Sequence, residues 1–195
     1  MSKTKTWIVV LGVLAIIALW AVNAYNGLVA GEEEVESAWS QVENQYQRRA
    51  DLVPNLVATV KGYAAHEKET LEGVVEARAK ATQITIDPAN ATAEQLMAFQ
   101  KAQGELSQAL GRLLAVAENY PDLKANANFR DLQAQLEGTE NRIAVARQQF
   151  NDSARAYNTK VRRFPSNIIA GICGFEKKPY FEAEEGANKA PKVEF

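Results

Sequence analysis

The chain has 195 residues, with 22 lysines and arginines against 24 aspartates and glutamates, and its formal net charge is -2. This length supports one folded domain beside a membrane anchor, and the near-neutral charge provides no electrostatic basis for binding nucleic acid. The single cysteine excludes an internal disulfide bond, so the domain has to be stable without one.

The first predicted element is an apolar segment over residues 7–24, which contains no charged residue. About 20 apolar residues in a helix cross the roughly 30 Å hydrocarbon core of a bilayer. Trp7 lies at one end of the segment, and Trp20 and Tyr25 lie near the other, as expected for the aromatic belts of the two membrane interfaces. We therefore predict a single transmembrane helix over residues 7–24, with the lipid bilayer as its partner.

The charges on either side of this segment predict its orientation. Lys3 and Lys5 lie in the short tip before it, residues 1–6, and no basic residue follows the segment before Arg48. The positive-inside rule therefore places the tip in the cytoplasm and the rest of the chain outside it. A cleaved signal peptide is the alternative, because Val-Asn-Ala at positions 22–24 resembles a small-residue cleavage site. The apolar run is longer than that of a usual signal peptide, which favours the anchor.

A short juxtamembrane joint, residues 25–31, links the span to the rest of the chain. Gly27 and Gly31 have the small-xxx-small spacing with which transmembrane helices pair, and the same glycines would suit a flexible joint. Four acidic side chains follow, and they either complement the dipole at a helix start or hold a divalent cation. These residues are Glu32, Glu33, Glu34 and Glu36.

A long amphipathic helix is predicted from Glu32 to about Ala81. Its apolar positions, which include Trp39 and Tyr46, recur every three or four residues, the period with which coiled-coil-like helices pack. Pro54 removes a hydrogen bond inside this helix, but the apolar stripe keeps its phase across the proline. We therefore predict a kink at Pro54 rather than a reversal of the chain, and a full break there would create a fourth helix.

Two further helices follow. Thr92 and Gln95 form a capping-box pattern that begins the second helix, and a third helix, parallel to the first, is predicted from Asn126 to Phe164. The predicted fold class is all-α: one N-terminal transmembrane helix followed by a long antiparallel helical bundle over residues 32–168. The bundle has three long helices, or four if the first helix breaks at Pro54.

The C-terminal part, residues 169–195, combines an apolar docking segment with a polar tail. The apolar run at 167–175 is too short to span a membrane, so it is expected to pack on the end of the bundle or to touch lipid. The last twenty residues carry scattered charges, glycine and proline, and are expected to be mostly disordered.

The sequence contains no constellation of residues typical of an active site. His66 is the only histidine, whereas a zinc site needs three or four clustered ligands. The serines have no other candidate base, and no glycine-rich phosphate loop follows a predicted strand. We therefore assign no catalytic, cofactor-binding or metal-binding residue, and we expect a protein that is not an enzyme and carries no cofactor.

Polar residues within the predicted helix seams have a structural interpretation. Arg49 lies in the stripe of the first helix, and Glu140 and Arg142 lie on or beside the stripe of the third. Charged groups at such positions can form networks between helices that fix their register. We expect these three residues to act in this way.

Several stretches of the chain resemble the LemA family of bacterial membrane proteins. They are YNGLV at 25–29, AWSQVE at 38–43, QRRADLVPNLV at 47–57, VKGYA at 60–64, TENRIA at 139–144, Tyr157-Asn158, Phe164-Pro165-Ser166 and Pro179-Tyr180-Phe181. The resemblance covers about residues 7–182, and one departure is Phe150-Asn151, where the family often has Tyr-Asn. The resemblance implies a single-pass protein of the bacterial plasma (inner) membrane with a long helical bundle. We expect Pro54, Tyr157 and Asn158 to have structural roles in this bundle. It implies no settled activity.

Two functions fit these predictions. The first is a membrane-anchored structural or scaffolding protein of the bacterial envelope that forms homo-oligomers. The first helix outruns the second, so its membrane-proximal stripe is left for another copy unless Phe129 and Leu132 of the third helix cover it. The candidate contacts between copies are Gly27, Gly31, Trp39 and Tyr46. The second function is an accessory subunit that presents its bundle to another protein of the envelope.

Overall fold

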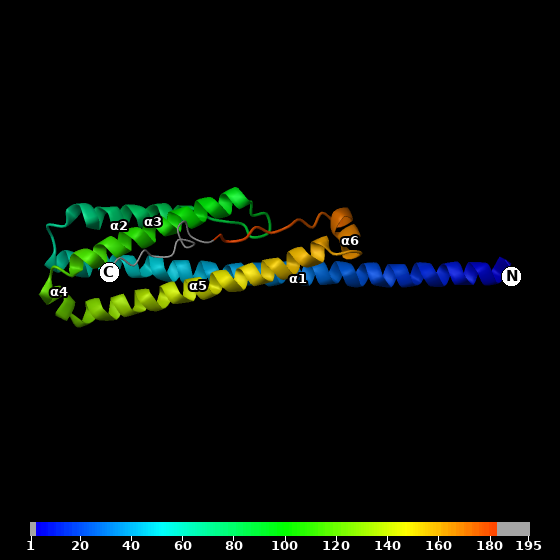
Figure 1. Cartoon of the computed structure of the whole chain (residues 1–195), viewed down its shortest axis with the longest axis horizontal. Helices are drawn as coiled ribbons and strands as arrows, with labels where there is room; N and C mark the ends of the chain where they lie inside the picture. Colours follow the sequence, from blue (N-terminus) through cyan, green and yellow to red (C-terminus); the bar gives the residue numbers. More distant parts are fainter. Residues whose placement is uncertain (1–2, 183–195) are drawn as a thin grey trace, which may run out of the picture.

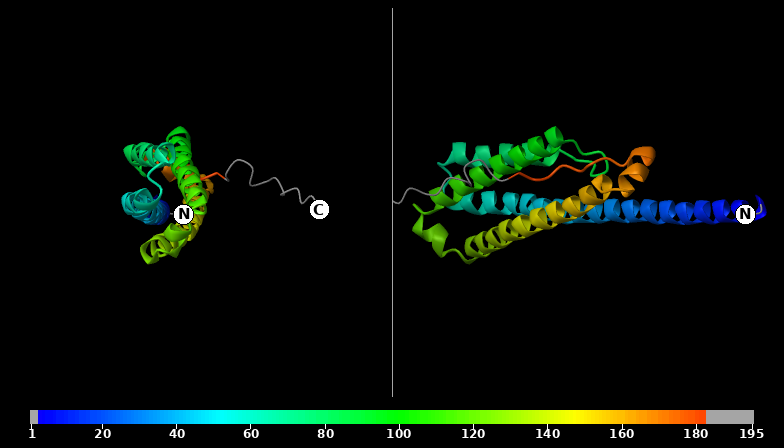
Figure 2. Two further views of the ribbon diagram at one scale, coloured as in Figure 1. Left: turned by 90° about the vertical axis from the view of Figure 1, so that its left-hand side faces the viewer. Right: turned by 45° about the vertical axis from the view of Figure 1, so that its right-hand side comes forward.

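A computed structural model describes residues 3–182, and every regular element in that range is an α-helix, which confirms the predicted all-α class (Figure 1). The helices are α1 (Lys3–Tyr63), α2 (Lys68–Gln83), α3 (Ala93–Ala117), α4 (Pro121–Ala125), α5 (Ala127–Arg162) and α6 (Ser166–Cys173). The long helices α1, α2, α3 and α5 form an elongated bundle. The short helix α4 lies at its distal end, and α6 lies at the opposite end (Figure 1, Figure 2).

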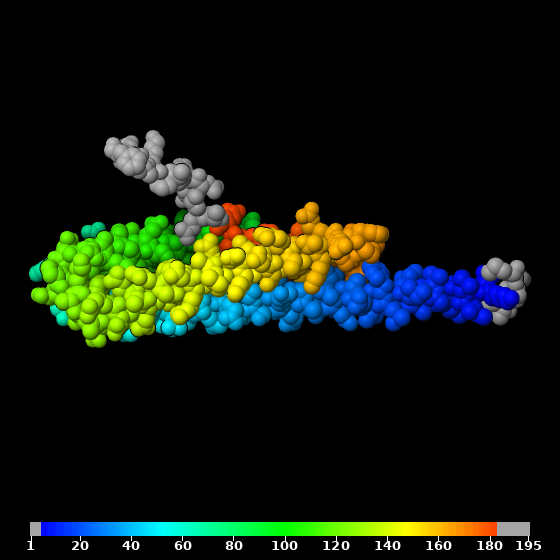
Figure 3. All heavy atoms as spheres, turned by 60° about the horizontal axis from the view of Figure 1, so that its bottom comes forward, coloured from blue at the N-terminus to red at the C-terminus, as the bar shows by residue number. Residues whose placement is uncertain are grey.

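The candidate membrane span and the first bundle helix are one helix. α1 has 61 residues, about 90 Å at 1.5 Å per residue, and it runs without interruption through residues 25–31, where the sequence allowed a joint. Among the described helices, α1 alone contains a window long and apolar enough to cross a membrane. Its first part, residues 5–19, is exposed throughout and projects beyond the other helices (Figure 3). We call this part the arm.

α1 passes through Pro54 without ending, as predicted. Proline has no N–H to donate to the carbonyl four residues earlier in the helix, which here belongs to Ala50. Arg78 of α2 replaces the missing donor from outside the helix, because its Nε donates to the Ala50 carbonyl oxygen at 2.8 Å. The proline therefore leaves no acceptor of α1 unsatisfied at this position.

The chain reverses at residues 64–67, so the prediction of a single first helix reaching about Ala81 is wrong. This turn contains neither glycine nor proline. A contact with a remote element holds it, since the Tyr120 hydroxyl donates to the Glu67 carboxylate at 3.0 Å. This hydrogen bond also raises the pKa of Tyr120 above its ordinary value. Beyond the turn, α2 packs back against the end of α1.

This additional reversal changes the direction of α5. Because α1, α2, α3 and α5 alternate in direction, α5 runs antiparallel to α1 and returns to the base of the arm (Figure 1). The prediction that the third long helix runs parallel to the first is therefore wrong. The last turns of α5, rather than its first turns, lie beside the part of α1 that is next to the candidate span.

Side-chain caps begin two of the helices, and the capping box at Thr92 is the one that the sequence predicts. The Thr92 hydroxyl accepts from the Gln95 backbone at 3.2 Å, and the Thr92 backbone donates to the Gln95 side chain at 3.0 Å, which completes the capping box of α3. Asn126 caps α5 by accepting from the backbone of Phe129 at 3.0 Å. Capping satisfies amide donors that have no partner inside the helix.

The bundle contains two apolar cores of different composition. The distal core is mainly aliphatic and joins the second half of α1 to α2, α3, α4 and the first turns of α5; it includes Val53, Leu56, Val60, Leu71, Val74, Leu106, Leu110, Leu113, Leu123, Phe129 and Leu136. The proximal core is aromatic and lies nearer the arm; it includes Val35, Trp39, Val42, Tyr46, Leu96, Phe99, Ile143, Phe150, Tyr157 and Phe181.

Trp39 and Tyr46 belong to the proximal core and are only 3% and 6% exposed. The ring centroid of Trp39 lies 5.4 Å from that of Phe99, 5.6 Å from that of Phe150 and 5.9 Å from that of Phe181. These rings come from α3, from the second half of α5 and from the C-terminal segment, and not from the first turns of α5. The expected contact between copies at Trp39 and Tyr46 is therefore wrong for this structure, because neither side chain is at the surface.

The C-terminal part is ordered further than predicted. α6 packs against α1 and α5, and Gly174, with φ of 78°, ends it in the left-handed conformation that glycine adopts most easily. An extended segment follows at residues 174–182, which we call the strap, so the prediction of a mostly disordered tail is wrong for residues 176–182. The rest of that predicted tail, residues 183–195, lies outside the described part of the chain.

Candidate functional site

Arg49 connects three of the long helices at the level between the two cores. Its guanidinium, 1% exposed, donates from Nη1 to Ser107 Oγ at 2.6 Å and to Glu140 Oε1 at 2.8 Å. From Nη2 it donates to the side-chain and backbone oxygens of Gln103, at 2.6 and 3.0 Å. The Tyr46 ring centroid lies 5.1 Å from the guanidinium carbon. Arg49 thus joins α1 to both α3 and α5.

The network extends to the fourth long helix through Gln103, whose amide nitrogen donates to the backbone carbonyl of Ala81 at the end of α2, at 3.2 Å. Within the described residues, the Nε atom of Arg49 is buried and has no hydrogen-bond partner. A buried charge is tolerated when it is paired and hydrogen-bonded, which the four other contacts of Arg49 provide. A change in helix register would break these contacts, so the network specifies how α1, α2, α3 and α5 align.

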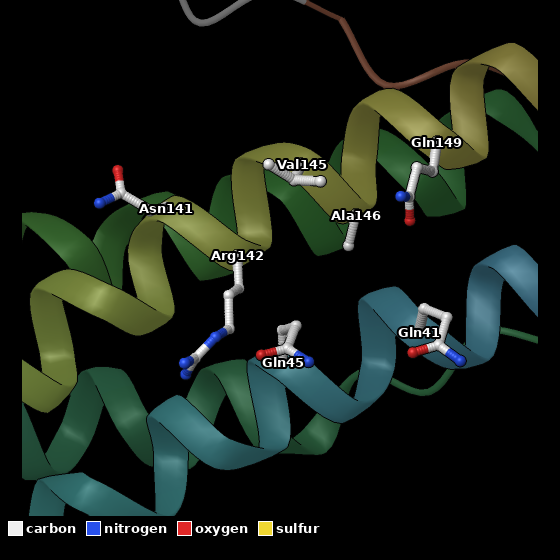
Figure 4. Close-up of a pocket in the computed structure, with 7 residues that line it drawn as sticks. All are labelled: Gln41, Gln45, Asn141, Arg142, Val145, Ala146 and Gln149. Carbon is white, nitrogen blue, oxygen red and sulfur yellow. The ribbon is translucent and has the colours of Figure 1, made fainter.

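The structure brings together two of the three residues expected to form an inter-helix network, Arg49 and Glu140, and it leaves Arg142 apart. Arg142 is exposed and lies over a shallow pocket of about 300 Å³ between α1 and α5, where it points toward Gln45 (Figure 4). The side-chain oxygen of Gln45 is buried and has no hydrogen-bond partner among residues 3–182. Arg142 therefore lines a pocket in the contact between α1 and α5 and takes no part in the Arg49 network.

A larger groove, of about 760 Å³, lies against the Arg49 network between α3 and α5. Its lining carries both signs of charge and several neutral polar groups. The lining residues are Tyr46, Arg49, Met97, Gln100, Lys101, Gln103, Gly104, Glu105, Ser107, Gln108, Glu140, Ile143, Arg147 and Glu182. This lining contains no histidine or cysteine, and its mixed charges and amides match the surface of a polypeptide better than a strongly charged ligand.

Side-chain amides of α5 bind the backbone of the strap. Asn158 donates to the Lys178 carbonyl at 2.8 Å and accepts from the Lys178 amide at 2.9 Å. Asn151, seven residues earlier, contacts Phe181 in the same two ways, at 3.0 and 2.9 Å. Each asparagine thus pairs with one strap residue much as a neighbouring β-strand would.

The end of the strap closes one end of the groove. Gln100 of α3 donates to the Glu182 carbonyl at 2.9 Å and accepts from the Glu182 amide at 3.3 Å. Arg147 of α5 donates to the same carbonyl at 3.0 Å, and its guanidinium carbon lies 5.0 Å from the Phe181 ring centroid. The strap therefore connects α3 to α5 where these two helices flank the groove.

Lys178 attaches the strap to the middle of α1, at Glu32. The side chain is buried, and its Nζ donates to Glu32 Oε1 at 2.6 Å and to the Ala89 carbonyl oxygen at 2.5 Å. The Tyr157 ring centroid lies 5.7 Å from the same nitrogen. Glu32, one of the four acidic residues noted in the sequence, thus neutralises a buried lysine. Sequence reasoning missed Lys178 because nothing distinguishes it from the other charged residues of the predicted tail.

Tyr157 of α5 lies against Gly31 of α1. A Cβ atom at Gly31 would lie 3.3 Å from Tyr157 Cδ2 and 3.3 Å from Lys160 Nζ, so glycine permits this approach within one chain. Among residues 3–182, no atom of another part of the chain lies within 4 Å of a Cβ placed at Gly27. Burial raises the pKa of Tyr157 to about 12, and the nearby carboxylates of Glu32 and Glu176 add to this effect.

The remaining candidates from the sequence lie apart from the groove. Trp7 is 68% exposed on the arm, Tyr25 is 44% exposed, and Trp20 is partly covered. His66 is exposed in the turn between α1 and α2. Within residues 3–182, no group of three or more histidine, cysteine, aspartate or glutamate side chains is placed to hold a metal ion.

Comparison with known proteins places this chain in a family. The model of the LemA family matches residues 38–195. The chain belongs to the LemA family. The stretches that carried the resemblance in the sequence now have positions in this LemA-family fold. Arg49 and Glu140 lie in two of them and form the ion pair, while Asn158 and Phe181 lie in two others and attach the strap.

Curated relatives of this LemA-family chain share similar sequence over most of its length. Magnetosome protein MamQ 2 of Paramagnetospirillum magneticum is 30% identical over 205 residues, which cover 95% of this chain and 75% of the relative. Magnetosome protein MamQ of Magnetospirillum gryphiswaldense is 30% identical over 87% of this chain and 68% of its own length. Protein LemA of Metamycoplasma hominis is 24% identical over 84% of this chain and 71% of its own length.

Proposed function

We propose that this protein is a non-enzymatic structural or scaffolding protein of the bacterial envelope, which holds a stiff helical bundle next to one face of the plasma (inner) membrane. The observation that carries the proposal is the continuity of α1, a single helix of 61 residues that is both the candidate span and the central helix of the bundle. A continuous helix transmits position and orientation from the membrane to the bundle, whereas a flexible linker would not.

The polar groups of the bundle support this assignment. Arg49, Glu140 and Gln103 tie the long helices to one another, and Asn151, Asn158 and Lys178 tie the strap to the bundle. These groups are used in contacts within the chain rather than gathered around an open reaction site. The family and the relatives named as magnetosome proteins support an association with membranes.

The orientation that belongs to this function places residues 1–6 in the cytoplasm and the bundle outside it, with the bilayer as a partner. The test is a pair of fusions after Phe195, one to a reporter that is active only outside the cytoplasm and one to a reporter that is active only inside. We expect the first fusion to be active and the second to be inactive. Stable expression of both fusions with the opposite pattern of activity would reverse the topology.

Self-association is the second part of the proposal, and the exposed arm is the surface that remains for it, since Trp39, Tyr46 and Gly31 are covered within one chain. Anchoring in one plane raises the effective concentration of the arms, so a weak contact would be populated. Light scattering of the full chain in mild detergent is expected to give a multiple of the 21.5 kDa chain mass. A monomer would contradict the homo-oligomer.

The groove between α3 and α5 favours a second candidate function, an accessory subunit that binds another protein of the envelope. Met97 is 47% exposed and lies in the lining of the groove, whereas Val75 is 53% exposed on α2 and does not. A photo-crosslinking amino acid at position 97 in intact cells should capture a partner that one at position 75 does not. Equal capture at both positions, or none at either, would argue against the groove as a binding surface.

A further inference from the structure

The arm is shorter than a membrane is thick. Every residue from Lys5 to Leu19 is exposed, and partial burial begins at Trp20. These 15 residues extend about 22 Å as an α-helix, whereas the hydrocarbon core of a bilayer is about 30 Å thick. If α1 crosses the membrane, about five more residues have to lie within the hydrocarbon core, and these reach approximately to Ala24. That part of α1 is partly covered, since Trp20, Ala21 and Ala24 are half-buried.

Phe175, two residues after α6, contacts α1 just beyond these additional turns, at Tyr25. The ring centroids of Tyr25 and Phe175 are 5.6 Å apart in an edge-to-face arrangement. Figure 1 and Figure 2 show α6 next to the base of the arm, at the end of the bundle that faces the candidate span. A bilayer deep enough to cover α1 as far as Ala24 therefore reaches the level of α6.

The outer face of α6 is apolar. Phe164, Ile168 and Ile172 are 75%, 47% and 76% exposed. Ile168 and Ile172 are four residues apart in α6, so they lie on one side of this helix, and Phe164 lies in the turn just before it. Ala170, by contrast, is buried against the bundle. Three large apolar side chains that are exposed on α6 and the turn before it have no advantage in water, because burying each of them would be favourable by about 1.5–3 kcal/mol.

Exposed basic side chains flank α6 on both sides along the chain. Arg162 and Arg163 precede α6, Lys177 follows it, and all three are exposed. α6 itself contains no charged residue. The exposed acidic groups nearest in the chain or in the middle of α1 are Glu33, Glu34 and Glu176. The basic side chains are long enough to reach the phosphate groups from the edges of an inserted apolar face.

We propose that α6 is an interfacial foot: it inserts Phe164, Ile168 and Ile172 into the boundary between headgroups and acyl chains, in the leaflet where the arm leaves the membrane. The inference rests on the membrane anchor of the proposed function and adds a second attachment to it. A single helix can tilt and rotate in a bilayer, whereas a helix and a foot at its base fix the orientation of the bundle.

Cys173, the only cysteine of the chain, is exposed at the end of α6 and reports on the foot without any substitution. The full chain is labelled there with an environment-sensitive fluorophore and reconstituted into vesicles of phosphatidylcholine and phosphatidylglycerol. The control carries Cys173→Ser with Ala144→Cys, which places the same label on an exposed site of α5 about 27 Å before Arg162. Lipids with a nitroxide near the headgroup should quench Cys173 more than about twofold better than the control site, and aqueous iodide should show the opposite preference.

A substitution tests whether the apolar face is the cause. Phe164→Glu with Ile172→Glu changes two exposed side chains, so the helical content and the melting temperature of the bundle should not change. The label at Cys173 should then become accessible to iodide while the protein still floats with the vesicles. The matched control, Val75→Glu with Val145→Glu, also replaces two exposed apolar residues and should leave the quenching unchanged.

Different results of these experiments would contradict the membrane anchor and the insertion of α6. A protein that does not float with the vesicles would overturn the anchor, and the foot with it. A protein that floats while the Cys173 label is as accessible to iodide as the Ala144→Cys label would overturn the foot alone. Quenching by nitroxide lipids that is unaffected by Phe164→Glu with Ile172→Glu would also overturn it.

Discussion

The two ends of the bundle are stabilised in different ways. The distal core is built mainly from aliphatic residues of helices that follow one another along the chain, α1, α2, α3 and α4. The proximal core joins segments that are far apart in sequence, because Trp39, Phe99, Phe150 and Phe181 meet there. Directional contacts also accumulate at the proximal end, where asparagine and glutamine side chains bind the strap.

This difference indicates which end depends on the complete chain. The distal end can assemble from neighbouring helices by burial of apolar surface, which is not directional. The proximal end requires α5 to return and the strap to be in place, since Phe181 covers one side of Trp39. Arg49 lies between the two ends and couples them. Substitutions at the two ends should therefore differ in their effect on the strap.

Trp39→Ala should have the largest effect, a loss of about 3–5 kcal/mol in the free energy of unfolding, because it removes a buried ring that contacts three others. It should also release the strap, which urea unfolding combined with limited proteolysis near Phe181 would detect. Leu113→Ala in the distal core should cost about 2–5 kcal/mol but leave the strap protected. Equal protection of the strap in both variants would contradict the proposed difference between the distal and proximal ends.

Arg49→Met should cost about 2–3 kcal/mol, because Gln103 and Ser107 lose their donor in a buried site. Glu140 contributes less to this cost, since its side chain is 40% exposed and water can solvate it. Arg49→Lys should recover part of the loss, because one ammonium group cannot reach all the acceptors of the guanidinium. Urea unfolding measures both variants, and full recovery with lysine would contradict the proposed geometry.

Arg78→Met should cost about 1–2 kcal/mol, because the Ala50 carbonyl then loses the only donor that replaces the missing N–H of Pro54. In a Pro54→Ala background the backbone amide of residue 54 can donate to Ala50, so the same substitution should cost less than about 0.5 kcal/mol. A double-mutant cycle from unfolding curves gives the coupling directly. Additive effects would show that Arg78 stabilises α2 in some other way.

Asn158→Leu should cost about 1 kcal/mol, confined to the strap, because it removes both backbone partners of Lys178. Hydrogen exchange should accelerate in the strap and remain unchanged in the distal core. The control is Asn128→Leu, at an exposed asparagine on the first turn of α5. Acceleration throughout the bundle would mean that the strap and the distal core unfold together.

Tyr157→Phe should have the smallest effect near pH 7, because the buried hydroxyl has no hydrogen-bond partner within residues 3–182. The effect of this substitution on stability appears at high pH. The pKa of Tyr157 rises from 10.0 to about 12 in the folded chain, so the unfolded chain releases this proton first. The intact protein should therefore lose more stability than the variant as pH increases from 10 to 12. Parallel pH curves for both proteins would contradict this effect.

Much of the architecture is predictable from the sequence by itself. The apolar run, the helix periods and the Thr92–Gln95 capping box are local patterns, and they predicted the span, the all-α class and the start of α3. The continuity of α1 at Pro54 was predictable because the apolar stripe keeps its phase there. The polar residues in the seams, Arg49 and Glu140, also pointed to a network between helices.

The remaining features depend on contacts between segments that are far apart in the sequence. The turn at residues 64–67 has no glycine or proline, and its position depends on packing of α2 against α1 and on the hydroxyl of Tyr120. That reversal sets the direction of α5, and the direction of α5 determines that Phe150, rather than a second copy of the chain, covers Trp39. The strap becomes ordered because Asn151, Asn158 and Glu32, all distant in sequence, supply its partners. Short-range patterns report the conformation of a segment, whereas its partners depend on contacts between segments that the same patterns do not encode.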